Sequence, residues 1–369
     1  MTQTLEYLGA DCLLPGWQDA EVNGTRITLP EVAQPIGGDP RGKNLLSMLQ
    51  LGPDDIHVYI DEARAAEEIV NDPRRRGIGL LQFAHMDVVM RQPSTRTGGS
   101  MTAAMAKLGG TAELISGMAS SSEAKGESRA DSDLALATQS DVLAIRTADN
   151  FGPVFAAQAI EQARRDGKFP HVVPVINLGD GKVEHPTQAL GDLYIMQKYL
   201  GDLDGRTLAI VGDHERYRAH HSLLIGAATL GMHVIAVESP AAPVPEGLVT
   251  IAGDRLQRTT DLDAAMREAD VLYMGRNPDE YDGEDQREIE RSAELAAAFH
   301  GWTVDYERLQ QMHKDAVLLH PRPRRNELDV SVDADPRAKD VEQMKVMIPM
   351  RMAIIAQHMG ASIMFEEAA

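Results

Sequence analysis

Residues 94–97 place three hydroxyls and one guanidinium on four consecutive positions. Ser94, Thr95 and Thr97 can each donate an O–H group, and Arg96 presents a planar fork of N–H donors. The segment that follows has the composition of a helix, and the free N–H groups of a helix's first turn attract an oxyanion. The Gly-Lys-Ser/Thr ending of a nucleotide-binding P-loop is missing. The stretch therefore predicts another kind of anion site, although a hydroxyl that merely caps the helix is an equally open interpretation.

Further cations stand at the ends of predicted strands or in the loops after them: Lys125, Arg146, Arg218, Arg276, Arg322 and Arg324. Any one of them could be a solvated surface charge. In an acidic chain, however, their shared position predicts a cleft that binds an anion. His185 stands directly before a helix that begins at Pro186, where it is either a packed core histidine or a catalyst.

The sequence carries no motif for a metal, a dinucleotide or a covalent nucleophile. Residues 185–189 lack metal-ligand spacing, and the adjacent His220 and His221 would point apart on a helix. No Gly-x-Gly-x-x-Gly follows the strand predicted at residues 207–211, and no serine stands on a nucleophile elbow. We therefore expect no cofactor, and chemistry on a doubly anionic substrate without a covalent protein intermediate.

The elements that must position these side chains alternate between strands and helices. Strands are predicted at residues 79–83, 86–90, 111–115, 142–146, 172–177, 207–211, 233–237, 271–274 and 316–320. With helices between them, this order predicts an α/β protein with two doubly wound parallel-sheet domains and an interdomain active-site cleft.

The domain boundaries can be placed from the same pattern. Residues 1–40 form an N-terminal extension in this interpretation, with a hairpin across residues 22–25. The first domain comprises residues 41–185 plus 343–369, so that the last helix returns to cover the first sheet. The second domain comprises residues 186–342.

Composition narrows the class of protein. The chain of 369 residues has 56 acidic and 36 basic residues, a formal net charge of −20 and one cysteine, Cys12. Nucleic-acid binding is disfavoured because phosphate backbones need clustered Lys and Arg, and a lone cysteine excludes an intrachain disulfide. The start lacks a basic n-region, and charged residues interrupt the apolar stretch 346–365. We expect no signal peptide, no membrane association and a cytoplasmic protein.

Seven segments stand in the order of the aspartate/ornithine carbamoyltransferase motifs: Ser94-Thr95-Arg96-Thr97, residues 125–128, Arg146, residues 185–188, 212–223, 273–276 and 320–324. The chain resembles that family over residues ~45–365 and is closest to the aspartate carbamoyltransferase catalytic chain. The resemblance implies a transferase that moves the carbamoyl group of carbamoyl phosphate to L-aspartate, in pyrimidine biosynthesis. It also implies that the first domain binds carbamoyl phosphate and that the second binds the acceptor.

The resemblance assigns roles to individual residues. The phosphate would be held by Ser94, Thr95, Arg96, Thr97 and Arg146. The carbonyl would be polarised by Thr97, Arg146 and His185. The NH2 group would be held by Gln188 and the backbone carbonyls of Pro321 and Arg322. Two residues would reach into a neighbouring subunit's site in a homotrimer, Ser121 and Lys125.

On the acceptor side, Arg218 and Arg276 match the pair that clamps the two carboxylates of aspartate. The chain departs from the family pattern nearby. Pro278 stands where a Gln usually receives the acceptor's amino group, and Arg322 replaces a Leu, which adds a charge beside the reacting centre. Two alternatives therefore stay open: a carbamoyltransferase for another amino or amide acceptor, and a non-catalytic paralogue.

Overall fold

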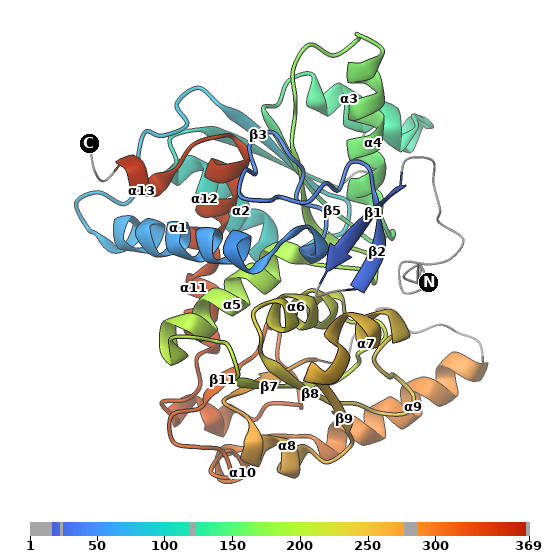
Figure 1. The fold of residues 1–369 in the computed structure, drawn as a ribbon, viewed down its shortest axis with the longest axis vertical. Helices are drawn as coiled ribbons and strands as arrows, with labels where there is room; N and C mark the ends of the chain where they lie inside the picture. Colours follow the sequence, from blue (N-terminus) through green and yellow to red (C-terminus); the bar gives the residue numbers. More distant parts are fainter. Residues whose placement is uncertain (1–16, 23–24, 118–122, 277–285, 367–369) are drawn as a thin grey trace.

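The computed structural model describes residues 17–22, 25–117, 123–276 and 286–366, and it shows two α/β lobes (Figure 1). The sheet of the first lobe is parallel, in the order β4-β3-β5-β6. Its strands are β3 (His85–Met90), β4 (Thr111–Ser116), β5 (Val142–Thr147) and β6 (Val175–Asp180). The helices of this lobe are α1 (Pro53–Asn71), α2 (Thr95–Lys107), α3 (Arg129–Ala137) and α4 (Gly152–Arg165). Because helices cover both faces, the central strands β3 and β5 are nearly continuous runs of buried residues.

The second lobe is built around a parallel sheet in the order β11-β10-β7-β8-β9. Its strands are β7 (Thr207–Val211), β8 (His233–Val237), β9 (Leu256–Thr259), β10 (Val271–Met274) and β11 (Val317–Leu319). The helices are α6 (Arg218–Thr229), α7 (Glu246–Ala252), α8 (Leu262–Glu268), α9 (Gln286–Gly301) and α10 (Tyr306–Leu309). Two parallel-sheet domains were the fold that the sequence predicted.

Each sheet has a point where the direction of strand addition reverses. In the first sheet β4 and β5 flank β3, and in the second sheet β8 and β10 flank β7. Loops that leave neighbouring strands at such a point diverge and open a crevice at the carboxyl ends. The hydroxyl segment 94–97 follows β3, and Arg146 lies near the end of β5. Arg218 and Arg276 follow β7 and β10 in the same way, so the topology brings all four features to the two crevices.

The connections between the lobes lie close to these crevices. α5 (Pro186–Leu200) leads from β6 into the second lobe, and α11 (Asp340–Lys345) and α12 (Met347–His358) lead back. α12 packs against α1 and α2, so the last part of the chain does return to the first lobe (Figure 1). The domain boundaries after residues 185 and 342 stay predictions.

Three local features can be compared with the sequence prediction. The expected hairpin is confirmed, since β1 (Trp17–Val22) pairs antiparallel with β2 (Thr25–Pro30). The strand predicted at residues 79–83 is wrong, because these residues form turns in which Phe83 has φ 73° and is 97% exposed. The short edge strand β9 was not predicted, because its half-exposed residues form no apolar run.

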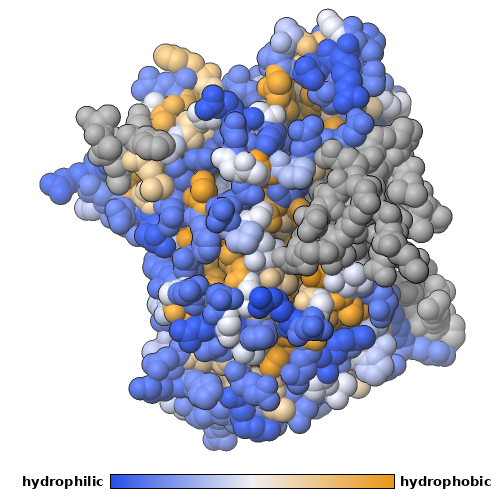
Figure 2. Space-filling model, viewed as in Figure 1, coloured by the Kyte–Doolittle hydropathy of each residue, from blue (hydrophilic) through white to orange (hydrophobic). Residues whose placement is uncertain are grey.

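The surface agrees with the polar composition. The face in Figure 2 is mainly hydrophilic, with scattered hydrophobic areas. Among the helices that the structure describes, none combines the length and the apolar character that a membrane span requires.

Candidate active site

A cavity of about 290 Å³ lies between the lobes. The arginines in its lining are Arg96, Arg146, Arg218, Arg276, Arg322 and Arg351. The other polar groups include Ser94, Thr97, Ser100, His185, Gln188, Tyr217, His320 and Gln343. None of the described lining residues is acidic, so the cavity has the charge that an anionic ligand requires.

The hydroxyl segment both caps α2 and faces the cavity. Ser94 is the N-cap residue: its Oγ accepts from the Thr97 N–H at 3.4 Å and donates to Thr97 Oγ1 at 3.1 Å. The two interpretations of this segment are therefore compatible, because capping does not remove the hydroxyls from the cavity wall. The side chain of Thr95, in the first turn of α2, is exposed and is not in the described lining, so its expected contact with a phosphate stays a prediction.

Arg96 spans the cavity from the first lobe to the second. Its Nη2 donates to the backbone carbonyl of Arg322 at 2.7 Å. Burial lowers the pKa of Arg96, and the guanidinium groups of Arg276 and Arg322 lower it further. Like charges gathered in this way repel one another until an anion neutralises them.

His185 and Gln188 lie at the start of α5. The backbone N–H of His185 donates to Ser222 Oγ at 2.9 Å, and its Nδ1 is 3.5 Å from Thr187 Oγ1. The pKa of His185 is held well below its usual value, first by burial and then by the charge of Arg146. The imidazole is therefore neutral at physiological pH and can still donate one hydrogen bond.

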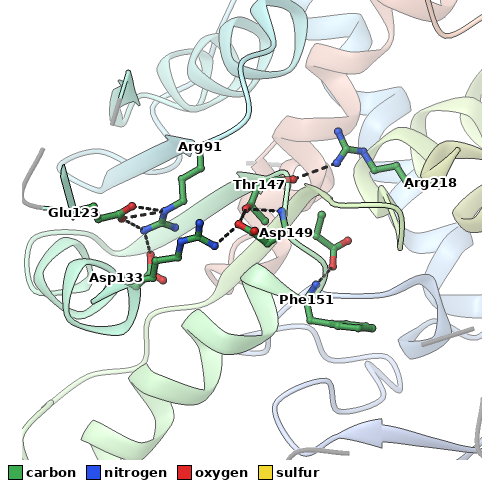
Figure 3. A network of polar contacts seen from close by, with 9 residues as sticks. Arg91, Glu123, Asp133, Thr147, Asp149, Phe151 and Arg218 are labelled. Atoms are coloured by element: carbon green, nitrogen blue, oxygen red, sulfur yellow. Dashed lines mark hydrogen bonds and ion pairs between the residues drawn. The ribbon is translucent and has the colours of Figure 1, made fainter. Parts of the chain in front are cut away.

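Arg146 and Arg218 are held by backbone carbonyls. Arg146 Nη1 donates to the Leu178 carbonyl at 3.2 Å. Arg218 begins α6 in the second lobe but donates to the Thr147 carbonyl of the first lobe at 3.3 Å (Figure 3). It also donates to the Gly181 carbonyl at 3.1 Å. Arg218 also donates to Gln92 Oε1 at 2.5 Å. These partners fix where the two guanidinium groups stand at the cavity.

Arg276 and Arg322 belong to the second lobe's wall. The guanidinium of Arg276 lies over the ring of Tyr217, 5.7 Å from the centroid. The side chain of Arg322 forms an ion pair with Asp340, while its backbone carbonyl accepts from Arg96. The charge that the sequence adds at Arg322 does line the cavity, where it is paired with Asp340. Its place beside the reacting centre stays a prediction.

Two family models match the chain in order. The carbamoyl-P binding domain of the aspartate/ornithine carbamoyltransferases matches residues 43–198, and their Asp/Orn binding domain matches residues 204–358. The aspartate carbamoyltransferase catalytic subunit of Thermoplasma acidophilum is 32% identical over 87% of this chain and 99% of its own length. That of Alkaliphilus oremlandii is 33% identical over 87% of this chain and 92% of its own length. The chain belongs to the aspartate/ornithine carbamoyltransferase family.

Solved structures agree with this membership. An aspartate transcarbamoylase from Trypanosoma cruzi, in complex with carbamoyl phosphate, has a TM-score of 0.79 and 31% identity over 88% of this chain and 98% of its own. The complex of the same enzyme with N-(phosphonacetyl)-L-aspartic acid has a TM-score of 0.77 and 31% identity over the same shares. The two-lobe fold is therefore the fold of these carbamoyltransferases.

Sequence reasoning missed Arg351, which carbamoyltransferase motifs did not mark here. Its side chain is buried in α12, and its Nη1 donates to the carbonyls of Arg96 at 3.4 Å and Thr97 at 3.3 Å. Burial lowers its pKa to about 10, so it stays charged at neutral pH. A lone arginine within an otherwise apolar helix was the available signal.

Besides Thr95, two of the described residues that the sequence singled out do not line this cavity. Arg324 pairs with Asp333 and is not in the described lining. Lys125 is exposed at the end of the short helix η5 (Glu123–Lys125), also outside the described lining. Ser121, like Pro278 on the acceptor side, lies outside the described residues.

The helix η5 is tied to the first lobe by an ion-pair network. Arg91, which follows β3, donates from Nε to Glu123 at 3.0 Å and from Nη2 to Asp133 at 2.9 Å (Figure 3). These contacts lower the pKa of Glu123 against the opposing effect of its burial. The network therefore fixes the first residue of η5, and Lys125, the last residue of η5, is exposed.

Proposed function

We propose that this chain transfers the carbamoyl group of carbamoyl phosphate to the amino group of L-aspartate, giving N-carbamoyl-L-aspartate and phosphate. The observation that carries the proposal is the single cavity in which hydroxyls, arginines, a neutral histidine and a glutamine from both lobes converge. Such a lining suits a doubly anionic donor and a dicarboxylate acceptor. The names of the relatives support the same reaction.

In this proposal the donor's phosphate lies at the start of α2. Ser94 and Thr97 supply hydroxyls, and the free backbone N–H groups near Thr95 supply further donors. Arg96 and Arg146 neutralise the phosphate charge. Arg351 contributes indirectly, because it holds the carbonyl groups of the first turn of α2.

The reaction needs stabilisation of an oxyanion rather than a covalent nucleophile. The neutral amine attacks the carbonyl carbon, the C=O electron pair moves to oxygen, and the resulting tetrahedral intermediate expels phosphate as the C–O bond breaks. Thr97, Arg146 and His185 donate to that oxygen, and preorganised donors of this kind supply much of the rate enhancement. The departing phosphate takes the amine's proton, so no protein base is required.

His185 suits this task because it is a neutral donor. Thr187 Oγ1 lies beside Nδ1, and a hydroxyl that donates there leaves the ring proton on Nε2, which in this proposal donates to the carbonyl oxygen. The role fits an imidazole whose pKa is too low for it to act as an acid near neutrality.

The acceptor's two carboxylates are assigned to Arg218 and Arg276. Arg218 is fixed by carbonyls of both Thr147 and Gly181, and Arg276 by the ring of Tyr217. Planar guanidinium groups bind carboxylates in a bidentate manner. Two such groups in one cavity favour a dicarboxylic amino acid over one with a cationic side chain.

A phosphate-release assay with a panel of acceptors tests this function. With carbamoyl phosphate at a fixed concentration, aspartate should give turnover, while ornithine and simple amines should not. Turnover with another acceptor alone would refute aspartate and keep the carbamoyl transfer. Absence of release with every acceptor would refute the catalytic proposal.

The assembly proposed with this function is a homotrimer with shared sites, located in the cytoplasm. Lys125 is exposed and outside the described lining of its own cavity, as a residue that serves a neighbour would be, and Ser121 is assigned the same role. Mixing inactive Lys125→Ala with inactive His185→Ala protein should restore activity, because some mixed sites regain both native residues. No recovery after subunit exchange, or a fully active monomer, would contradict the shared site.

A further inference from the structure

Asp192 is a completely buried carboxylate in the middle of α5, one helical turn after Gln188. It accepts hydrogen bonds from three side chains. Oδ1 accepts from Gln188 Nε2 at 2.8 Å and from Gln343 Nε2 at 2.7 Å, and Oδ2 accepts from the Tyr273 hydroxyl at 2.8 Å. Asp192 itself does not line the cavity described above.

The three donors lead to three sides of the cavity. Gln188 lines it directly. Tyr273 lies in β10, three residues before Arg276. Gln343 lies in α11, and its Oε1 accepts from the backbone N–H of His320, at the start of the loop that contains Arg322. One carboxylate thus connects the proposed carbamoyl-binding amide of Gln188 to β10, which precedes Arg276, and to α11, which contacts the loop that contains Arg322.

The hydrogen bond to Asp192 decides which end of the Gln188 amide faces the substrate. An ionised carboxylate only accepts hydrogen bonds, so the NH2 end of the amide must point toward it. The amide oxygen is then left for the cavity, where it can accept from an N–H group. If the amide were reversed, its NH2 would oppose the NH2 of a carbamoyl group, and two donors would face each other.

We infer that Asp192 is a positioning residue for carbamoyl phosphate, because it fixes the Gln188 amide with its oxygen toward the carbamoyl nitrogen. The inference rests on the proposed function and goes beyond it, since it assigns recognition of the NH2 group to a residue that does not touch substrate. Burial raises the pKa of Asp192 to about 7, while its three donors oppose that rise. Each of these three groups donates a hydrogen bond, so all three favour the ionised carboxylate, which is the form that orients the Gln188 amide.

Isothermal titration calorimetry without any acceptor tests this role. The three ligands are carbamoyl phosphate, acetyl phosphate and inorganic phosphate. Acetyl phosphate has a methyl group in place of the NH2 group. In Asp192→Asn the amide of residue 192 can donate, so the Gln188 amide can turn around. Carbamoyl phosphate should then bind about tenfold more weakly, the loss expected for one hydrogen bond. Acetyl phosphate and inorganic phosphate should keep their affinities within about twofold, since neither has the NH2 group.

The matched control is Asp87→Asn. Asp87 is also a completely buried carboxylate, which accepts from Ser140 Oγ at 2.6 Å and Gln139 Nε2 at 3.0 Å, but it lies in β3 outside the described lining. This variant should leave the ratio of carbamoyl phosphate to acetyl phosphate affinity unchanged. Unchanged carbamoyl phosphate binding in Asp192→Asn, or an equal loss for all three ligands, would overturn the inference.

An exchanged pair of side chains tests the same contact in a second way, starting from Gln188→Glu, which leaves Asp192 in place. Gln188→Glu alone opposes two carboxylates and should bind carbamoyl phosphate poorly. Adding Asp192→Asn restores a donor toward residue 188 and leaves a carboxylate oxygen for the carbamoyl nitrogen, so binding should recover. No recovery would overturn the role of Asp192 alone, whereas a native protein that does not bind carbamoyl phosphate would refute the proposed function itself.

Discussion

Replacing Asp340 by Asn should destabilise the second lobe's wall, because it leaves the guanidinium of Arg322 without its counter-charge. The Arg322 side chain is 20% exposed and that of Asp340 is 5% exposed. Breaking a fully buried pair costs about 3–5 kcal/mol and an exposed pair about 0–1 kcal/mol. Water can reach Arg322 in part, so we expect a loss of about 2 kcal/mol in the free energy of unfolding.

A double-mutant cycle separates the pair from its surroundings. Arg322→Leu leaves the more deeply buried carboxylate unpaired and should cost at least as much as Asp340→Asn. The double variant should lose about 2 kcal/mol less than the sum of the two single losses. Denaturant unfolding at one protein concentration measures all three, since unfolding of an oligomer depends on concentration.

Steady-state kinetics complete this test. The backbone carbonyl of Arg322, and not its side chain, contacts Arg96. Arg322→Leu should therefore keep kcat within about threefold of the native enzyme once the protein is folded. Single losses that simply add would refute the stabilising pair, and a large fall in kcat without a change in stability would show that the Arg322 charge acts in the reaction.

Three further predictions concern the reaction and its pH dependence. Thr97→Val removes a proposed oxyanion donor and should lower kcat by a factor of about 10²–10³. Thr97→Ser keeps the hydroxyl and should retain most activity. Equal kcat values for the two variants would contradict this role of Thr97. The pKa of His185 lies well below 6.5 because of burial and neighbouring arginines, so kcat between about pH 6 and 8 should show no limb from its titration; a limb that disappears in His185→Gln would refute the neutral donor. Burial raises the pKa of Glu184 from 4.5 to about 7, so the folded state binds a proton that the unfolded state releases, and stability should decline as pH rises from about 4.5 through about 7. The urea midpoint of Glu184→Gln should decline less over this pH range than that of the native protein. Parallel declines in the two proteins would show that Glu184 does not cause the pH dependence.

Much of the fold was predictable from the chain because buried parallel strands are local patterns. Apolar runs such as residues 142–146 are followed directly by the polar residues that a strand's carboxyl end presents. This pattern does not identify edge strands or turns. β9 has no continuous apolar run. Residues 79–83 are mostly apolar but bend at Phe83, whose positive φ a strand cannot accept.

The candidate site also has features that the sequence predicts and features that only the tertiary structure shows. Sequence alone determined the types and order of the reactive groups, from the hydroxyl segment 94–97 to His185 and Arg276, because these are properties of single positions and short motifs. Only the tertiary structure decided which charges remain available. Arg218 donates to Gln92, which is 126 positions away, and Arg351 donates to the carbonyl of Arg96 across 255 positions. No local periodicity records such contacts, because they form only when two lobes and a returning helix enclose the same cavity.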